Sequence, residues 1–264
     1  MSSFHVESLC AGYDAKRVIN GLSFSLEGGS LMGVLGANGS GKTTLIRSIC
    51  GILRHEGACT LDGVRLEGLT ARQLSRLCSY IPQRSGVTID ISALDVVLMG
   101  FNPQLGLLER PTPAMKQQAL EALDRAGIGS MAETNYMHLS EGQKQLCILA
   151  RTLAADSSLL LLDEPESALD FRLRHRMLHT IRSWLAEADR CGIVTLHDPS
   201  LALNFCDRLL LLSGGVLTGC IRPGEDDLDK MEAMLKTIYG GLSLLRCKNR
   251  SGQEQLVMLK EGRI

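Results

Sequence analysis

Glycines, a lysine and two threonines between residues 36 and 44 are spaced to hold a polyphosphate. The segment matches G-x-x-x-x-G-K-[ST], and the predicted nucleotide-binding residues are Gly36, Ala37, Asn38, Gly39, Ser40, Gly41, Lys42, Thr43 and Thr44. Glycines let backbone N–H groups turn inward around phosphates, and Lys42 supplies a point charge. The hydroxyl of Thr43 is a hard ligand of the kind that Mg²⁺ prefers. The alternative, a chance glycine-rich turn, leaves the apolar strand before the loop and the amphipathic helix after it unexplained.

Two carboxylates, Asp163 and Glu164, follow a run of four leucines. Such a run is typical of a buried parallel strand, and open α/β sheets bind ligands beyond the carboxyl ends of their strands. Asp163 is therefore predicted to orient Mg²⁺, and Glu164 to be the general base for an attacking water. The alternative of a solvated strand end is disfavoured by the phosphate loop. Together the two motifs predict a P-loop NTPase, without saying which kind.

The elements that must position these residues alternate between strand and helix. Strands are predicted at residues 4–9, 22–26, 31–35, 58–61, 159–162, 193–196 and 209–212, with a hairpin turn at 213–215. Helices are predicted at 43–53, 115–126, 140–155 and 173–188, in a chain whose middle, about 88–155, is largely helical. A helix at 229–239 and strands at 242–246 and 255–259 are predicted in a motif-free last segment, 222–264. This alternation implies an α/β core that carries the helical middle as an insertion.

The composition is that of an ordinary globular protein. Of its 264 residues 45% are hydrophobic, and 28 basic against 29 acidic residues give a net charge of -1. These values exclude a disordered chain and disfavour a general nucleic-acid binder. No run approaches 18 apolar residues and no signal-peptide pattern is present, so the chain is expected in the cytoplasm. The nine cysteines contain no CxxC pair, and are expected to be mostly buried reduced thiols rather than metal or disulfide sites.

A third candidate element is the helix that begins after Ser140. Ser140 and Gln143 form a capping-box pattern, which in an arbitrary protein would mark only a good helix start. Ser140 and Gly142 also place a hydroxyl and a bare backbone at the positive end of the helix, where a γ-phosphate could bind. Ser140, Gly142 and Gln143 therefore join the predicted nucleotide-binding set.

The segment Leu139-Ser140-Glu141-Gly142-Gln143 resembles the LSGGQ signature of the ABC family of ATPases. Further family positions match in order, and they are the adenine-stacking aromatic Tyr13, the Q-loop glutamine Gln83, the D-loop at 167–170 and the switch histidine His197. The resemblance covers roughly residues 4–221. It implies a P-loop core with a mostly parallel sheet, an N-terminal antiparallel β subdomain and an inserted α-helical subdomain at about 86–155. These parts would form an ATP-binding domain of residues 1–240, followed by a short extension at 241–264.

The resemblance also implies the chemistry of the site, which would bind ATP and Mg²⁺ and hydrolyse the ATP. The implied metal ligands are Thr43, Gln83 and Asp163, and the implied catalytic residues are Glu164, His197 and Gln83. Two copies would pair head to tail, so that the phosphate loop of one faces the signature helix of the other. The pair would lie at the cytoplasmic face of the cell membrane as peripheral subunits. There it would drive transmembrane permease subunits that dock at about 84–113, and serve a substrate-binding protein indirectly, with no nucleic acid partner.

Two residues depart from the family pattern. Glu141 replaces the first glycine of LSGGQ, and we expect it to point outward, because a carboxylate facing the γ-phosphate would repel it. Glu166 replaces the small hydroxyl residue before the D-loop serine, which would alter contacts between the two copies.

Residues 96–111 resemble the importer subgroup for iron chelates, haem and cobalamin. That subgroup typically carries an arginine and a histidine in this stretch, where this chain has Phe101 and Gln104. The predicted function is thus an ATPase subunit that powers such an importer. A soluble ABC-type ATPase of DNA repair or ribosomes is the alternative, which the single compact motif set disfavours. A regulatory protein that binds nucleotide without turnover is disfavoured by Glu164 and His197.

Overall fold

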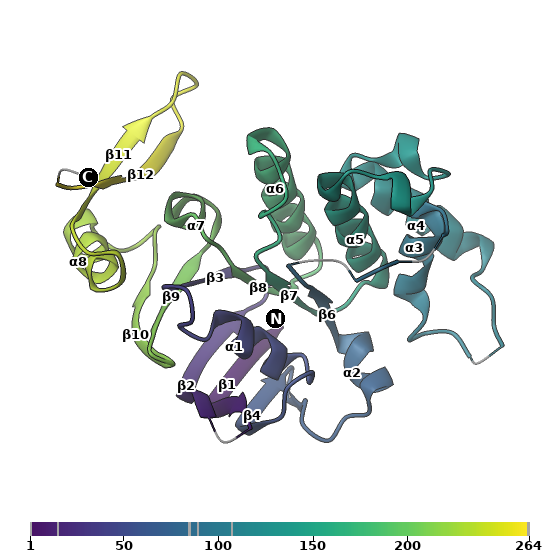
Figure 1. The fold of residues 1–264 in the computed structure, drawn as a ribbon, viewed down its shortest axis with the longest axis horizontal. Coiled ribbons are helices and arrows are strands. Elements are labelled where there is room, and N and C mark those ends of the chain that lie inside the picture. The colour runs from purple at the N-terminus through teal and green to yellow at the C-terminus, as the bar shows by residue number, and fades with distance from the viewer. Residues whose placement is uncertain (1, 15, 84–85, 89, 107, 263–264) are drawn as a thin grey trace.

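The computed structural model describes residues 2–14, 16–83, 86–88, 90–106 and 108–262. Its central sheet is built from β3 Leu31–Leu35, β6 Cys78–Ile81, β7 Leu159–Asp163, β8 Cys191–Thr195, β9 Arg208–Ser213 and β10 Val216–Ile221. These strands lie in the order β10-β9-β3-β8-β7-β6 (Figure 1). Only β10 in this sheet is antiparallel to its neighbour. The predicted α/β class with a mostly parallel sheet is confirmed.

Strands β3, β7 and β8 form the buried middle of this sheet, because their sequences are apolar almost throughout. Every residue of the three strands is buried, as expected for strands covered on both faces. The parallel pairing of β7 with β8 sets Asp163 opposite Thr195. The residues that follow the two strands therefore meet at one edge of the sheet.

The N-terminal strands form a second sheet in the order β2-β1-β4-β5, antiparallel throughout. Its strands are β1 Ser3–Tyr13, β2 Lys16–Glu27, β4 His55–Leu61 and β5 Val64–Arg65. Helix α1 (Lys42–Ile49) lies between the two sheets, since its Leu45 and Ile46 share one buried cluster with Phe4 of β1 and Leu161 of β7. The predicted antiparallel β subdomain is confirmed, and α1 packs between it and the parallel sheet.

The helix predicted at residues 43–53 is too long. It ends at Ile49, because Cys50 caps it and Gly51 turns the chain with a φ of 72°. Outside the helical middle, four elements were not predicted, namely β5, α2 (Ala71–Leu77), β6 and α7 (Pro199–Phe205). All four are short, so their apolar residues make too little periodic pattern to stand out.

The helical middle is confirmed as a run of helices at one end of the central sheet (Figure 1). It contains α3 Ala93–Leu98, η1 Met99–Phe101, α4 Pro113–Ala126, η2 Gly129–Met131, η3 Tyr136–His138 and α5 Glu141–Ala155. Val97 of α3, Leu123 of α4 and Leu149 of α5 are fully buried in one cluster that continues into the central sheet. The helices therefore share a core with the sheet that carries the acidic pair.

The last part of the chain covers the same face of the central sheet as α5, the face turned away from α1, and its terminal hairpin lies at the other end from the helical middle (Figure 1). It consists of α6 Phe171–Glu187, α7, α8 Leu228–Tyr239 and the antiparallel hairpin of β11 Leu242–Lys248 and β12 Glu254–Lys260. The amide side chain of Asn204 in α7 donates to the backbone O of Leu256, at 2.7 Å, and accepts from its N–H, at 2.9 Å. No helix within the described ranges has the length and apolarity to cross a bilayer. The division of the chain at residue 240 stays a prediction.

Candidate active site

The phosphate loop joins β3 to α1 in a backbone conformation that requires glycine. Gly39 and Gly41 have φ values of 78° and 108°, which side-chain-bearing residues rarely adopt. A Cβ on Gly36 would lie 2.3 Å from the backbone O of Leu212, so a larger residue would displace the loop. The Ser40 hydroxyl is buried and has no partner among the described residues. The loop therefore has the close-turning backbone of a phosphate cradle and an unused donor inside it.

Lys42, at the start of α1, lies folded against this loop. Its Nζ donates to the backbone O of Gly36 at 2.9 Å and of Ala37 at 3.4 Å. Burial lowers the pKa of Lys42, while the carboxylates of Glu164 and Asp163 oppose that shift. A buried amine bonded only to carbonyls of the loop is well placed to contact phosphate oxygens that enter the same loop.

Thr43 and Asp163 meet where the loop approaches the end of β7. Thr43 Oγ1 donates to Asp163 Oδ1 at 3.1 Å, and Thr195 Oγ1 donates to the same oxygen at 2.9 Å. A carboxylate and a hydroxyl side by side form a hard oxygen donor set, which fits Mg²⁺. The structure thus brings the two predicted residues together. Thr195 was missed, although a hydroxyl at the end of an apolar strand is the signal that could have found it.

Glu164 is the point where the other predicted catalytic residues converge. Its Oε2 accepts from Gln83 Nε2 at 2.7 Å and lies 2.7 Å from His197 Nε2. Both partners share Oε2, which leaves Oε1 without a protein hydrogen bond among the described residues. Glu164 is 8% exposed, so a water at Oε1 would meet a largely dry carboxylate.

The backbone at Glu164 is held in an unusual conformation. Its φ is 50°, in the left-handed region that is uncommon for residues other than glycine. The N–H of Glu164 donates to Thr195 Oγ1 at 2.9 Å, and the backbone O of Glu164 accepts from the N–H of Ser167 at 3.2 Å. These contacts fix the turn after β7, so that the carboxylate points at the switch histidine.

The signature helix α5 begins as the sequence predicts. Ser140 Oγ accepts from the N–H of Gln143 at 3.3 Å, and Gln143 Oε1 accepts from the N–H of Ser140 at 2.9 Å, which completes the capping box. Glu141 points outward with its side chain 76% exposed, and it pairs with Lys144 at 2.8 Å. The expectation that this carboxylate turns away from the helix terminus is confirmed.

The signature residues lie apart from the phosphate loop of their own chain. In the part of the chain that the structure describes, no hydrogen bond or ion pair joins Ser140, Gly142 or Gln143 to residues 36–44. A Cβ on Gly142 would lie 3.3 Å from the backbone O of Ala168, in the D-loop. The signature helix and the D-loop are therefore neighbours, while the N-terminus of the signature helix faces outward.

Tyr13 lies at the end of β1, with 43% of its surface exposed. Arg47 of α1 is hydrogen-bonded to Tyr80 and Tyr13, and these bonds raise the pKa of Arg47. The tyrosine ring is thus held beside the helix that starts at the phosphate loop. That position suits an aromatic side chain on which the adenine ring of a nucleotide stacks.

Glu166 is buried under the switch histidine. It is 2% exposed, its Oε1 accepts from the backbone N–H of His197 at 3.2 Å, and its Oε2 has no partner among the described residues. Burial raises the pKa of this carboxyl, although its bonds and the nearby charges of His197 and Arg174 oppose the rise. The departure from the family pattern therefore acts inside the subunit, at the switch loop. The sequence alone suggested an effect on contacts between copies.

The sequence is similar to known transporter subunits over most of its length. The ABC transporter family model matches residues 19–167. The hemin import ATP-binding protein HmuV of Bordetella avium is 33% identical over 246 residues, which span 90% of this chain and 92% of that protein. A "Probable iron chelatin transport ATP-binding protein" of Helicobacter pylori is 33% identical over 212 residues, or 78% of this chain and 82% of that protein.

Solved structures resemble the whole architecture. A metal-chelate type ABC transporter in an inward-facing conformation superposes with a TM-score of 0.82 at 25% identity, over 99% of both chains. The dimeric post-hydrolysis structure of an ATP-binding cassette bound to ADP and Pi superposes with a TM-score of 0.73 at 21% identity, over 83% of this chain and 98% of that one. The second similarity concerns the fold alone.

Proposed function

Because this chain belongs to the ABC transporter family, as an ATP-binding and ATP-hydrolysing subunit, we propose that it powers the import of an iron chelate or haem. The named relatives act on hemin and on iron chelatin, which supports this substrate class. The observation that carries the catalytic proposal is the convergence of Gln83 and His197 on Glu164 Oε2, each at 2.7 Å. The soluble DNA-repair or ribosomal alternative is not favoured by these relatives.

The nucleotide site is proposed to use the residues that the sequence indicates. The loop from Gly36 to Thr44, with Lys42 at its centre, binds the phosphates, and Tyr13 stacks on the base. Thr43 and Asp163 hold Mg²⁺, with Gln83 as a further oxygen ligand. The metal ion, when bound, neutralises charge on the phosphates. Thr195 keeps Asp163 in place by its hydrogen bond of 2.9 Å.

Glu164 is proposed to be the general base. Its Oε1, which has no hydrogen-bond partner among the described residues, accepts a proton from the attacking water, while Gln83 and His197 fix the carboxylate through Oε2. The side chain of His197 is 50% exposed, so its single Nε2–H can turn from Glu164 to donate to the γ-phosphate of bound ATP. The buried setting of Glu164 strengthens both interactions, because little water competes with them.

The subunit is proposed to work as a head-to-tail pair with a permease. Among the described residues, Ser140, Gly142 and Gln143 make no hydrogen bond or ion pair to their own phosphate loop, so they are proposed to bind the nucleotide held by a second copy. Closure of the pair would complete both sites, as in a two-fold assembly in which each surface serves its counterpart. The pair would act at the cytoplasmic face of the membrane, and a substrate-binding protein would engage the permease from the other side.

The permease is proposed to dock on about residues 84–113, which follow the Q-loop. Residues 84, 85, 89 and 107 of the predicted docking stretch lie outside the described residues. Leu108 is 93% exposed, which suits a contact with an apolar partner surface. Arg72 and Arg76 of α2 both donate to the backbone O of Pro103, at 3.0 Å and 2.8 Å, and so anchor this loop to the nucleotide-binding core.

The catalytic proposal is tested by Glu164→Gln in the full-length chain. The amide keeps the shape of the side chain but cannot take a proton, so hydrolysis should fall about 10²–10⁴-fold while ATP still binds. The paired form should then accumulate with ATP, which size-exclusion chromatography would detect. Glu187→Gln, an exposed position on α6, is the matched control and should hydrolyse ATP normally. Unchanged hydrolysis in Glu164→Gln would remove Glu164 from its role.

The transport proposal is tested with the subunit and its permease in liposomes. ATP hydrolysis should rise when a substrate-binding protein on the permease side opposite to this subunit carries haem or a ferric chelate. The labelled haem or ferric chelate should then cross the liposome membrane. Stimulation by neither ligand would reject the substrate class but leave the ATPase assignment standing.

A further inference from the structure

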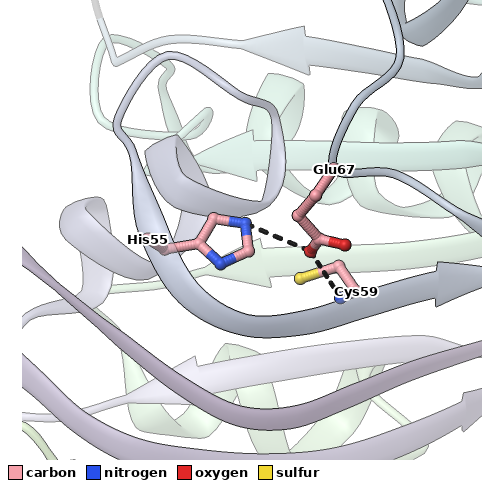
Figure 2. A group of neighbouring side chains, drawn as sticks. All are labelled: His55, Cys59 and Glu67. Carbon is pink, nitrogen blue, oxygen red and sulfur yellow. Dashed lines mark hydrogen bonds and ion pairs between the residues drawn. The ribbon is translucent and has the colours of Figure 1, made fainter.

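A second group of metal-ligating side chains lies on the antiparallel sheet, outside the nucleotide site. His55 and Cys59 lie four positions apart in β4. Glu67 follows β5 and reaches back to them. The ligand atoms of all three residues lie within 4.8 Å of one another. Figure 2 shows the imidazole facing the carboxylate, with the sulfur turned toward the space between them.

We propose that His55, Cys59 and Glu67 form a binding site for Zn²⁺ or a similar borderline divalent cation. The donor set contains one imidazole nitrogen, one thiol sulfur and one carboxylate oxygen. Zinc sites are built from these donors, whereas Mg²⁺ and Ca²⁺ take oxygen ligands.

The hydrogen bonds of His55 leave its Nε2 as a ligand. His55 Nδ1 lies 3.2 Å from the backbone O of Glu56, and because a carbonyl only accepts, Nδ1 carries the hydrogen. A ligating histidine is commonly oriented by such a bond from its other nitrogen. In the neutral ring, Nε2 then holds a lone pair, and it faces Glu67 Oε1 at 3.4 Å. A cation or a proton between these two acceptors would make their contact attractive.

The distance between the two atoms is compatible with a shared metal ion. Zinc bound tetrahedrally to nitrogen and oxygen holds these two atoms about 3.3–3.5 Å apart. A proton shared between imidazolium and carboxylate would bring them to about 2.7–2.9 Å. The observed 3.4 Å matches the first arrangement.

The carboxylate is already fixed in place for this role. Glu67 Oε1 accepts from the backbone N–H of Cys59 at 2.6 Å, and Oε2 accepts from Arg65 Nε at 3.0 Å. Although burial opposes it, these hydrogen bonds and His55 lower the pKa of Glu67, so the group is an anion. Burial and this anion raise the pKa of the Cys59 thiol. A bound cation reverses the rise in the pKa of the Cys59 thiol, because coordination deprotonates a thiol outright.

The site has room for a fourth ligand. His55 and Glu67 line a hollow of about 890 Å³ that also has Cys50, Cys78 and Tyr80 in its wall. Water in this hollow can complete a tetrahedral shell around three protein ligands.

The test uses the purified full-length chain without nucleotide. Zn²⁺ affinity is measured by competition with a chromophoric chelator, and Co²⁺ replaces Zn²⁺ to report a thiolate-to-cobalt absorption band. We expect one tightly bound ion per chain and a thiolate band. Cys59→Ser and His55→Gln should lower the affinity about 100-fold or more, and Cys59→Ser should abolish the band. Glu67→Gln, which keeps an acceptor for the Cys59 N–H, should weaken binding with little effect on folding.

Two controls separate this site from others in the chain. Cys220→Ser, at an exposed thiol, and Asp163→Asn, in the nucleotide site, should both keep the band. Circular dichroism would confirm that each variant is folded. Absence of the band in the unmodified chain, or its persistence in Cys59→Ser, would overturn the proposal. A proton-bridged His55–Glu67 pair would give the first of these results.

Discussion

The Nε2 of His197 lies 2.7 Å from the Oε2 of Glu164, just beyond the carboxyl ends of β8 and β7. Two features of the fold create this pair. The parallel register places Asp163 opposite Thr195, so the residues that follow these two lie side by side. The left-handed backbone at Glu164 then turns its carboxylate toward the histidine. The histidine is thereby positioned by the base as well as available to the phosphate.

Replacement of His197 by alanine should reduce kcat far more than nucleotide affinity. The variant loses the Nε2–H donor that contacts Glu164 and that can turn to the developing charge on the γ-phosphate, which typically costs about 10²–10³-fold in kcat. The KM for ATP should change little, because the phosphate loop and Lys42 remain. Steady-state hydrolysis assays would measure both constants. His5→Ala, at an exposed histidine on β1, is the control, and a His197→Ala enzyme with normal kcat would contradict the assignment.

The parts of the site that could be predicted are those that local sequence determines. Glycines at 36, 39 and 41 are required by loop geometry, and the leucine run before Asp163 is required by burial on both faces of the sheet. Each of these constraints appears as a pattern within a few neighbouring residues, so the motif indicates the structure.

The parts that could not be predicted depend on contacts between distant segments. Thr195 joins the site only because β8 pairs with β7 in one register. His55 and Glu67 meet only because the chain reverses between β4 and β5, and no short motif contains both. Glu166 is visible in the sequence only as a departure from the family pattern before the D-loop serine, whereas its burial results from the packing of the switch segment over it.

Replacement of Thr195 by valine should weaken the metal site without changing the shape of the core. Valine fills the same space but loses the hydrogen bonds to Asp163 and to the N–H of Glu164. Loss of such supporting bonds typically weakens metal binding about 10–100-fold, so hydrolysis should need more Mg²⁺. Titration of activity with Mg²⁺ at saturating ATP would reveal the shift.

A matched control for this change exists in α5. Thr152 is also buried, but its hydroxyl donates to the backbone O of Ile148 in the same helix, at 2.9 Å. Thr152→Val should therefore leave the Mg²⁺ requirement as it is. Equal Mg²⁺ curves for the two variants would show that Thr195 has no special role.

Replacement of Glu166 by glutamine should stabilise the chain above the ordinary pKa of glutamate. Burial raises the pKa of Glu166, so the folded state favours the protonated carboxyl. Stability is then complete below the unfolded pKa and is lost as pH rises through the folded value. The variant avoids this loss, about 1–3 kcal/mol for a buried group with an unpaired atom. The gain in Tm over the unmodified chain should grow between pH 4 and pH 8, as scanning calorimetry would show. Glu141→Gln, an exposed control, should give no such trend.

Replacement of Ser140 by arginine tests the facing arrangement in mixed pairs. The variant chain carries one tag and an unmodified chain carries another, so that tandem purification isolates pairs with one altered signature helix. If each signature helix serves the nucleotide of the other copy, the arginine introduced by Ser140→Arg blocks the helix terminus that faces the phosphate loop of the unmodified chain. The site at the phosphate loop of the unmodified chain should therefore lose turnover. A further Glu164→Gln change in one chain at a time assigns the remaining turnover to a single site. With Glu164→Gln in the chain that carries Ser140→Arg, hydrolysis should nearly vanish, whereas with Glu164→Gln in the other chain one working site should persist. The reverse result would mean that Ser140 serves the phosphate loop of its own chain, despite the absence of any bond between them in the described structure.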